Sequence, residues 1–424
     1  MLQAIREILA GISTFSAMAY IIFVQPSILS SANADFYTVF FATCVSSAIA
    51  TLLMGIWAKV PFAVAPAMGH NIFVSLFVVS SLGLNIKQAL FINLLSAIIS
   101  LAISLSNILP YIIRSIPDEL KGAISAGIGL LIAFVGLQWG GIVVANPGTL
   151  VKLGDVSSLP FLATALGLAV AGGAYSLGIR WGVILGVAAV TVFLWQKGFI
   201  NFEKVIEIPK VPTELPYVNF FKPDIGVLIK ALFILLFLDV FDTAGTLVGL
   251  FKVSGIEPDK KTVRRCFTVD SLGAVIGTLL GTTTLTTYVE SAVGIQAGGR
   301  TKITSIVVAV LFIASLFFSP IIKAIAGGIE FNGSTFHPQI AVPMIFVGIF
   351  MMSTLKINIE DITSAIPSFI TILIMAYSLS ISDGIAFGFI SWTFLKLVSG
   401  KWNDLNPAVV ILSLIFVAKF IFLG

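Results

Sequence analysis

Long apolar runs recur along the whole chain and limit the folds that it can adopt. Segments of about 16 to 25 residues, almost free of charge, alternate with short polar breaks, and a membrane-spanning helix needs about 20 such residues. Only 10% of the residues are charged, against about 25% in ordinary soluble proteins. The runs do not alternate with a period of two, which excludes the strands of a transmembrane barrel. The sequence therefore predicts an all-α polytopic membrane protein.

Polar breaks divide the sequence into fourteen candidate spans and an apolar tail. The spans are expected at residues 8–29, 36–58, 60–80, 87–107, 118–138, 160–178, 180–199, 226–251, 264–281, 284–297, 300–327, 339–354, 361–379 and 381–398. Lysine and arginine are concentrated in alternate loops, which favours a multi-pass protein of the cell (plasma) membrane with a cytoplasmic N-terminus. The tail, 406–423, is expected to lie against the membrane or the protein, with a fifteenth span as the alternative.

Composition argues against several other classes of protein. The net charge of +4 is attributed to lysine and arginine in the cytoplasmic loops. Membrane lipid is therefore the expected partner of the protein, and nucleic acid is not. Cys44 and Cys266 fall in or beside apolar runs and are interpreted as small hydrophobic side chains, without a disulfide. The two histidines, His70 and His337, make a metal site unexpected, and no cofactor is expected. The longest polar insert, 198–224, is too short for an extramembrane enzyme, and no signal peptide is evident.

One internal repeat is visible. "YSLGIRWGVILG" at 175–186 and "YSLSISDGIAFG" at 377–388 share six of twelve positions, and each opens the span that follows it. The alternative is chance similarity between apolar segments. If the repeat is genuine, each half of the chain holds seven spans, and an odd number makes the halves inverted in the membrane. Many secondary transporters are built in this way.

Few strongly polar side chains occur inside the apolar runs. A charged group at the centre of a membrane helix costs about 2.5–3.5 kcal/mol. Asp239, Asp242 and Glu290 are the clear acids, and His70 with Asn71 forms a polar pair. Asp239 and Asp242 are three positions apart, which places them on one helical face. These groups are predicted to be functional; the structural alternative is that the two aspartates cap a broken helix or pair with lysines.

Two segments contain residues that interrupt a helix. "KVPFAVAPAMGHNIFVS" at 59–75 holds two prolines and a glycine, and "GTTTLTTYVESAVGIQAGG" at 281–299 holds five threonines before Tyr288. They are spans three and ten, which are matching places in the two halves. Paired interrupted spans indicate a transporter's binding site. Asp239 and Asp242 are therefore predicted to face a cavity where these spans meet, one acid holding the ligand and the other carrying a coupling proton or orienting the first.

These stretches resemble a known family over nearly the whole chain. "GISTFSAMAYIIFVQPSIL" (11–29), "APAMGHNIF" (65–73), "DVFDTAGTLVG" (239–249), "GTTTLTTYVESAVGIQAGGRTKIT" (281–304) and "IPSFITILIMAYSLSISDGIAFGFI" (366–390) carry the likeness. They are similar to the AzgA-like adenine/guanine/hypoxanthine permeases of the nucleobase–cation symporter-2 (nucleobase/ascorbate transporter) superfamily. The resemblance implies transport of purine nucleobases by proton symport, in a homodimer, with an elevator or rocking form of alternating access.

The resemblance also implies an architecture and a set of site residues. Two inverted seven-span repeats would form a core (transport) domain, 1–117 with 223–327, and a gate domain, 118–222 with 328–424. Spans three and ten would be short half-helices preceded by extended strands that meet. Carried over by motif, the family's substrate-site amide is Asn71, and its acids are Asp239, Asp242 and Glu290.

The chain departs from the family pattern at two places. The usual Gly-Met-Gly-Leu-Asn of span three is Ala67–Asn71, with His70 before the asparagine, and the usual Asn before Pro26 is Gln25. His70 either alters substrate preference or pH dependence or, as the favoured interpretation, is a hydrogen-bonded packing residue. The departures bear on which purine is carried.

The purine class suggests how the site would work. Carboxylates accept from N–H groups, and an amide side chain both donates and accepts. Glu290 and Asp239 are therefore expected to accept from N–H groups of the base, while Asn71 contacts an edge of the base that has both a donor and an acceptor. Phe73, Tyr288 and Phe241 are candidates for apolar walls. The pair Asp239 and Asp242 is the candidate for proton coupling, with sodium left open as the ion.

Three alternatives have different tests. The same fold can carry uracil, xanthine or another small solute, including an anion, although an anion carrier should have a basic residue at its site. A membrane-embedded enzyme would change its ligand chemically. A channel would not accumulate a solute against its gradient.

Overall fold

The structure is a computed structural model that describes residues 2–106, 117–202, 204–215, 217–257, 259–353, 355 and 358–422. The chain forms two compact units. The first unit comprises Met1–Leu105 and Gly136–Pro343, and the second comprises Ser106–Val135 and Met344–Gly424. The core and gate domains expected from the family resemblance have other boundaries, and that division stays a prediction.

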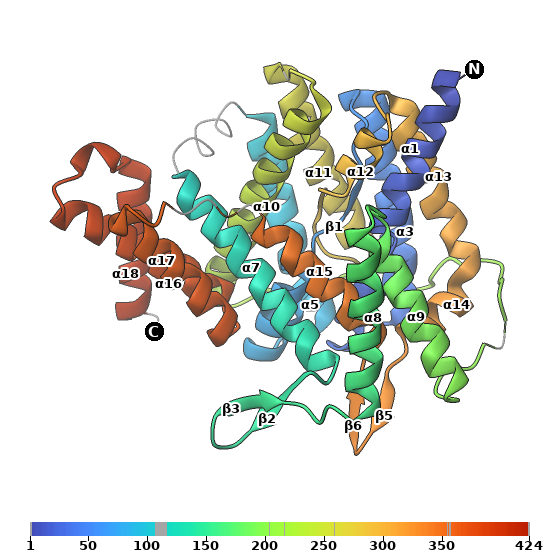
Figure 1. Cartoon of the computed structure of the whole chain (residues 1–424). Helices are drawn as coiled ribbons and strands as arrows, with labels where there is room; N and C mark the ends of the chain where they lie inside the picture. The colour runs from blue at the N-terminus through green and yellow to red at the C-terminus, as the bar shows by residue number, and fades with distance from the viewer. Residues whose placement is uncertain are drawn as a thin grey trace. The chain divides into compact units, whose positions relative to one another are not determined.

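The first half of the first unit consists of helices interrupted at one place by a strand (Figure 1). In chain order it holds α1 (Leu2–Met18), α2 (Ile21–Ser30), α3 (Phe36–Leu53), the π-helix η1 (Met54–Ala58), β1 (Val64–Pro66), α4 (Met68–Ile72), the π-helix η2 (Phe73–Ser81) and α5 (Ile86–Leu105).

The remainder of the first unit also consists mainly of helices, with one strand, β4, between two of them. It holds α8 (Leu159–Ser176), α9 (Gly182–Gln196), α10 (Ile225–Ser254), α11 (Lys260–Leu280), β4 (Leu285–Thr287), α12 (Ser291–Gln296), α13 (Lys302–Ser315), the 3-10 helix η3 (Leu316–Phe318) and α14 (Ser319–Ala326). Two antiparallel hairpins, β2–β3 (Val143–Asn146 and Leu150–Leu153) and β5–β6 (Ile329–Phe331 and Ser334–Phe336), lie in its loops.

The second unit is helical in its described part. It contains α16 (Ile362–Ser378), α17 (Ile381–Val398), the 3-10 helix η4 (Trp402–Asp404) and α18 (Pro407–Phe422), while α7 (Asp118–Trp139) and α15 (Pro338–Met352) have residues in both units. Ala123 and Ala126 of α7 form a buried cluster with Ile372 of α16. The tail helix α18 packs on α17, where the Ser413 and Thr393 hydroxyls lie 2.6 Å apart.

Polar side chains at the starts of several helices satisfy their free backbone N–H groups. Asp35, Asp224, Asp259 and Asp361 accept from backbone N–H groups of the first turns of α3, α10, α11 and α16, and the Thr301 hydroxyl accepts from the second residue of α13. The first four N–H groups of a helix have no partner within it, so such caps favour these starting points. Helix boundaries thus follow from residues in the polar breaks.

Most of the predicted spans agree with the structure to within about four residues. The first, predicted at 8–29, instead begins at Leu2 and is divided into α1 and α2. Six helices in the described part are long and apolar enough to cross a membrane: Gln3–Ser30, Phe36–Ala58, Ile86–Leu105, Asp118–Trp139, Leu159–Ser176 and Lys302–Ala326. Shorter apolar helices accompany them. The helical membrane fold is therefore confirmed, while the count of fourteen spans in two inverted repeats stays a prediction.

The two interrupted segments pair with each other. β1 and β4 run antiparallel, with Val64 opposite Thr287, Ala65 opposite Thr286 and Pro66 opposite Leu285. All six residues are buried, and β1 lies beside α3 and α11 (Figure 1). Non-helical backbone in a membrane protein needs partners within the protein, and each strand supplies them to the other. The expected extended strands that meet are thus confirmed.

The repeated motif joins two packed helices in both places. The first copy joins α8 to α9 and the second joins α16 to α17, and each pair of helices is closely packed. A Cβ atom on Gly182 of α9 would lie 2.9 Å from the Ala171 carbonyl oxygen, and one on its counterpart Gly384 of α17 would lie 2.9 Å from the Thr371 carbonyl oxygen. Glycine at these positions allows a close helix approach, which accounts for its recurrence in the repeat.

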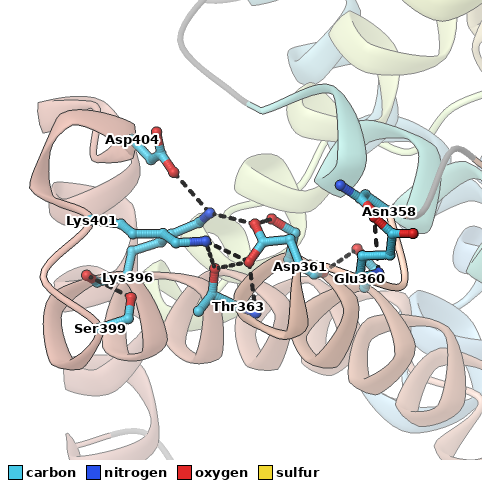
Figure 2. Close-up of polar contacts among 10 residues, drawn as sticks. Asn358, Glu360, Asp361, Thr363, Lys396, Ser399, Lys401 and Asp404 are labelled. Carbon is cyan, nitrogen blue, oxygen red and sulfur yellow. Dashed lines mark hydrogen bonds and ion pairs between the residues drawn. The ribbon is translucent and has the colours of Figure 1, made fainter.

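A cluster of charged side chains ties together the ends of the helices in the second unit (Figure 2). The Lys396 ammonium, only 3% exposed, lies 3.1 Å from Asp361 and 2.9 Å from Asp404. Lys401 donates to the other Asp361 oxygen at 2.7 Å. Because Asp361 caps the start of α16, Lys396 belongs to α17 and Asp404 to η4, the cluster connects three elements of the unit.

Candidate functional site

Asn71 lies on α4, directly after the strand β1. Its side chain is fully buried, and its Oδ1 accepts a hydrogen bond from the Thr283 hydroxyl, which precedes β4. The backbone N–H of Ala67 donates to the Thr284 carbonyl at 2.8 Å and extends the strand pairing to this point. The two interrupted segments are therefore joined by side chains as well as by backbone.

Glu290 lies just after β4, at the start of the short helix α12. The Tyr20 hydroxyl donates to its Oε1 at 2.5 Å, and Tyr20 stands at the break between α1 and α2. Both side chains are buried, at 8% and 2% exposure. Tyr288, two residues before Glu290, donates its hydroxyl to the Pro66 carbonyl at 2.6 Å. This hydrogen bond ties the end of β4 to β1, a role that the sequence did not predict.

Asp239 and Asp242 lie on α10, which packs against α4, β4 and α12. Asp239 is 5% exposed, and its Oδ2 accepts from the Ser100 hydroxyl of α5. Its Oδ1 is buried without a hydrogen-bond partner among the described residues. Asp242 is close enough to Asp239 and to Glu290 for their charges to interact. The three predicted acids therefore share one neighbourhood of the first unit.

His70 and Phe73 are engaged by the protein itself. The His70 ring nitrogen Nε2 lies 3.3 Å from the Leu235 carbonyl oxygen of α10; a carbonyl only accepts, so this nitrogen donates. The Phe73 ring stacks on Phe77, with the ring centroids 5.0 Å apart. Both contacts favour packing roles, and a role of either residue in substrate binding stays a prediction. The side chain of Phe241 lies outside the described residues.

Asp270 of α11 is a buried acid that was not among the site residues predicted from the sequence. Its carboxylate accepts from the backbone N–H of Thr287 at 3.0 Å, from the Thr287 hydroxyl at 2.9 Å and from the Thr243 hydroxyl at 3.1 Å. The Thr243 hydroxyl also lies 3.1 Å from that of Thr286. Asp270 therefore anchors β4 to α10 and α11. Its position inside an apolar span was the signal that could have identified it.

A polar stripe on α5 faces the same region. Asn93 donates to the Thr278 hydroxyl of α11 at 2.7 Å and accepts from the Thr284 hydroxyl at 3.0 Å. Ser100, two turns further along α5, contacts Asp239 and lies 3.1 Å from the Ser271 hydroxyl. Buried polar groups rarely persist without partners. The threonines and serines that the sequence places in apolar spans thus support the carboxylates and the strands.

The site offers acceptors and donors but no cluster suited to a metal ion. No group of three or more histidine, cysteine or acidic side chains is arranged to hold a metal in the part of the chain that the structure describes. Asp239 and Glu290 are acceptors when ionised, whereas Asn71 offers an amide. Such a set can bind the hydrogen-bonding edge of a flat, neutral solute. The open cavity expected between them stays a prediction.

Paired broken segments with buried acids beside them, in a helical membrane protein, are typical of membrane transporters. Solved structures show the same fold. The transmembrane domain of the cyanobacterial bicarbonate transporter BicA matches with a TM-score of 0.65 at 16% identity, covering 89% of this chain and 97% of that one. The murine anion transporter Slc26a9 matches with a TM-score of 0.66 at 12% identity, covering 93% and 68%.

The chain belongs to the permease family known as Xan_ur_permease, whose profile matches residues 5–331. A putative permease of Methanocaldococcus jannaschii is 39% identical over 99% of this chain and 95% of its own length. Guanine/hypoxanthine permease PbuG of Bacillus subtilis is 38% identical over 99% and 96%. Adenine permease AdeP of Escherichia coli is 34% identical over 98% and 93%. These relatives are permeases, and the chain is a transporter rather than an enzyme.

Proposed function

We propose that this protein imports purine nucleobases, namely adenine, guanine or hypoxanthine, by proton symport across the cell membrane. Relatives similar over almost their whole length are named as adenine and guanine/hypoxanthine permeases. The observation that carries the proposal is the pairing of β1 with β4, because it joins the segments of Asn71 and Glu290 beside the helix of Asp239.

In this proposal, the two acids and the amide each bind a different position on the edge of the base. Asp239 Oδ1, which is buried without a partner among the described residues, accepts an N–H of the base. Glu290, whose Oε1 already receives the Tyr20 hydroxyl, accepts a second with its other oxygen. Asn71 contacts a third position. A carboxylate that accepts from an N–H forms a stronger hydrogen bond than a neutral acceptor does.

The proton is carried by the pair Asp239 and Asp242. They lie three residues apart on α10 and their charges interact, so a proton on one changes what the other can bind. Protonation and base binding then become mutually dependent, which is what symport requires. We further propose two inverted seven-span repeats, a homodimer and a cytoplasmic N-terminus; the matching glycines of the two motif copies support the repeat.

The proposal is tested by uptake into proteoliposomes that contain the purified protein. An inward proton gradient should drive uptake of labelled adenine or hypoxanthine, whereas an inward sodium gradient should not. Competition by unlabelled adenine, guanine, hypoxanthine, xanthine and uracil then ranks the substrates. Asp239→Asn and Glu290→Gln should reduce uptake at least about tenfold, because each replaces a charged acceptor by an amide.

Asp155→Asn is a matched control, because Asp155 is an exposed acid in a loop after the β2–β3 hairpin. It should transport as the unaltered protein does. Uptake driven by sodium alone would overturn the proton assignment. Wild-type uptake by both Asp239→Asn and Glu290→Gln would refute the site.

A further inference from the structure

Gln25 connects α2 to the candidate site through two threonines. Its Nε2 donates to the Thr282 hydroxyl oxygen at 2.8 Å and to the Thr283 hydroxyl oxygen at 3.2 Å. The Thr283 hydroxyl in turn donates to Asn71 Oδ1. Gln25, Thr282, Thr283 and Asn71 are all fully buried. A continuous chain of hydrogen bonds therefore runs from α2, past the start of β4, to the amide of α4.

This series of hydrogen bonds has a direction, because the Thr283 hydroxyl has only one hydrogen to donate. Thr283 accepts from the Gln25 amide, so its own hydrogen points to Asn71 Oδ1. The Asn71 oxygen is thereby held by the protein. The Asn71 Nδ2 has Met68 Sδ beside it at 4.0 Å, and a thioether is only a weak acceptor. Because these hydrogen bonds occupy the Asn71 oxygen, the hydrogens of its Nδ2 can bond to a stronger acceptor than Met68.

We propose that Gln25 and Thr283 are positioning residues that set the substrate selectivity of Asn71. They fix its amide so that it donates to the solute, and this position therefore selects a base that presents an unprotonated ring nitrogen there. Asp239 and Glu290 take N–H groups at the other positions. This inference rests on the proposed nucleobase transport and adds to it the pattern of donors and acceptors that the substrate must match.

The length of the glutamine side chain makes this arrangement possible. Glutamine is one carbon longer than asparagine. Its amide reaches both Thr282 and Thr283 from α2, while its Oε1 is left without a partner among the described residues. The Gln25 amide nitrogen thus donates to Thr282 and Thr283 and orients their hydroxyl groups.

The test uses deaza analogues of the transported base, each with one ring nitrogen replaced by C–H. In the wild-type protein, the analogue that lacks the acceptor facing Asn71 should compete about tenfold less well than the parent base, the factor expected for one lost hydrogen bond. Thr283→Val keeps the shape and removes the hydroxyl, so this discrimination should disappear. Thr283→Ser retains the hydroxyl and should retain the discrimination.

A second variant tests the direction of the chain. The carboxylate in Gln25→Glu can only accept, so the Thr283 hydrogen turns toward it and Asn71 turns its Nδ2 to Thr283. The Asn71 oxygen then faces the solute, and the preference should move to analogues that carry an N–H at that position. Gln25→Met, which can neither donate nor accept strongly, should lower discrimination as Thr283→Val does.

Thr164→Val serves as a matched control. Thr164 of α8 is equally buried, but its hydroxyl donates to the Gly140 carbonyl oxygen and takes no part in the hydrogen bonds around Asn71. This variant should keep the wild-type ranking of analogues, and gel filtration reports whether each variant is folded. Unchanged discrimination in Thr283→Val and in Gln25→Met would overturn the inference alone. Failure of the wild-type protein to take up or bind any nucleobase would overturn the proposed function and the inference together.

Discussion

Single buried side chains at the candidate site do two kinds of work. Some have a polar atom without a strong partner among the described residues, as Asp239 Oδ1 and Asn71 Nδ2 do. Others hold these groups in place, as the Tyr20 hydroxyl does for Glu290 and the Ser100 hydroxyl does for Asp239. A buried polar group that loses its partner costs about 1–3 kcal/mol, so the supporting hydroxyls matter as much as the carboxylates that they contact.

Tyr20→Phe tests such a supporting residue. The variant keeps the ring, which is 2% exposed, and removes only the hydroxyl that donates to Glu290. A hydrogen bond to a charged group contributes about 1.5–3 kcal/mol, so the KM for the base should rise by roughly tenfold or more while the amount of folded protein changes little. Tyr37→Phe is the control, because the Tyr37 hydroxyl contacts the exposed loop at Lys210. An unchanged KM in Tyr20→Phe would show that Glu290 does not depend on this contact.

Elements that depend on local sequence were predictable, and contacts between distant residues were not. Apolar runs set the helices, and the prolines and threonines of 59–75 and 281–299 marked the strands β1 and β4, because backbone preference is a local property. Tyr20 bonds to Glu290 across 270 positions, and no local pattern encodes that pairing. Asp270 was overlooked because its segment begins with four basic residues, Lys260, Lys261, Arg264 and Arg265, among which one acid is unremarkable.

Cysteine cross-linking tests the register of β1 and β4. Ala65 and Thr286 are directly opposite, and such residues have Cβ atoms about 4.5–5.5 Å apart. In a background with Cys44 and Cys266 replaced by alanine, Ala65→Cys with Thr286→Cys should cross-link with a short thiol reagent, as measured by peptide mass spectrometry. Ala65→Cys with Thr282→Cys should not, because four residues along an extended chain span roughly 13 Å. Linkage of the second pair and not the first would show a different register.

The charged cluster that joins α16, α17 and η4 makes the stability of the second unit depend on pH. The Lys401 ammonium, together with the hydroxyls of Thr363 and Ser364, holds the pKa of the Asp361 carboxyl well below its usual range. The folded form therefore binds this proton less readily than the unfolded chain does. The stabilisation is fully present above about pH 4, where an unfolded aspartate is ionised, and is lost as the pH falls from there toward the pKa of the folded state.

Asp361→Asn should remove this dependence. The variant should melt at a lower temperature than the wild type at pH 6, because the ion pairs with Lys396 and Lys401 are gone. The difference should shrink as the pH is lowered below about 4. Thermal unfolding in detergent across this range measures it, with Asp118→Asn as the control, since the Asp118 carboxylate pairs with Lys121 at an exposed position. A difference in melting temperature that does not change with pH would contradict this role of Asp361.

At the scale of the whole molecule, the proposal requires that the free energy of a proton gradient be transferred to the base. One pH unit is worth about 1.4 kcal/mol, so with one proton per base and the membrane potential held at zero, an inward gradient of one unit should sustain about tenfold accumulation. A channel on the same fold would give no accumulation.

Asp239→Asn should abolish accumulation in proteoliposomes, because the pair that carries the proton is broken. If the asparagine variant still binds the base, it should continue to exchange labelled for unlabelled base at equal concentrations, since exchange needs no net proton movement. Accumulation by Asp239→Asn at the wild-type level would assign proton coupling to another group.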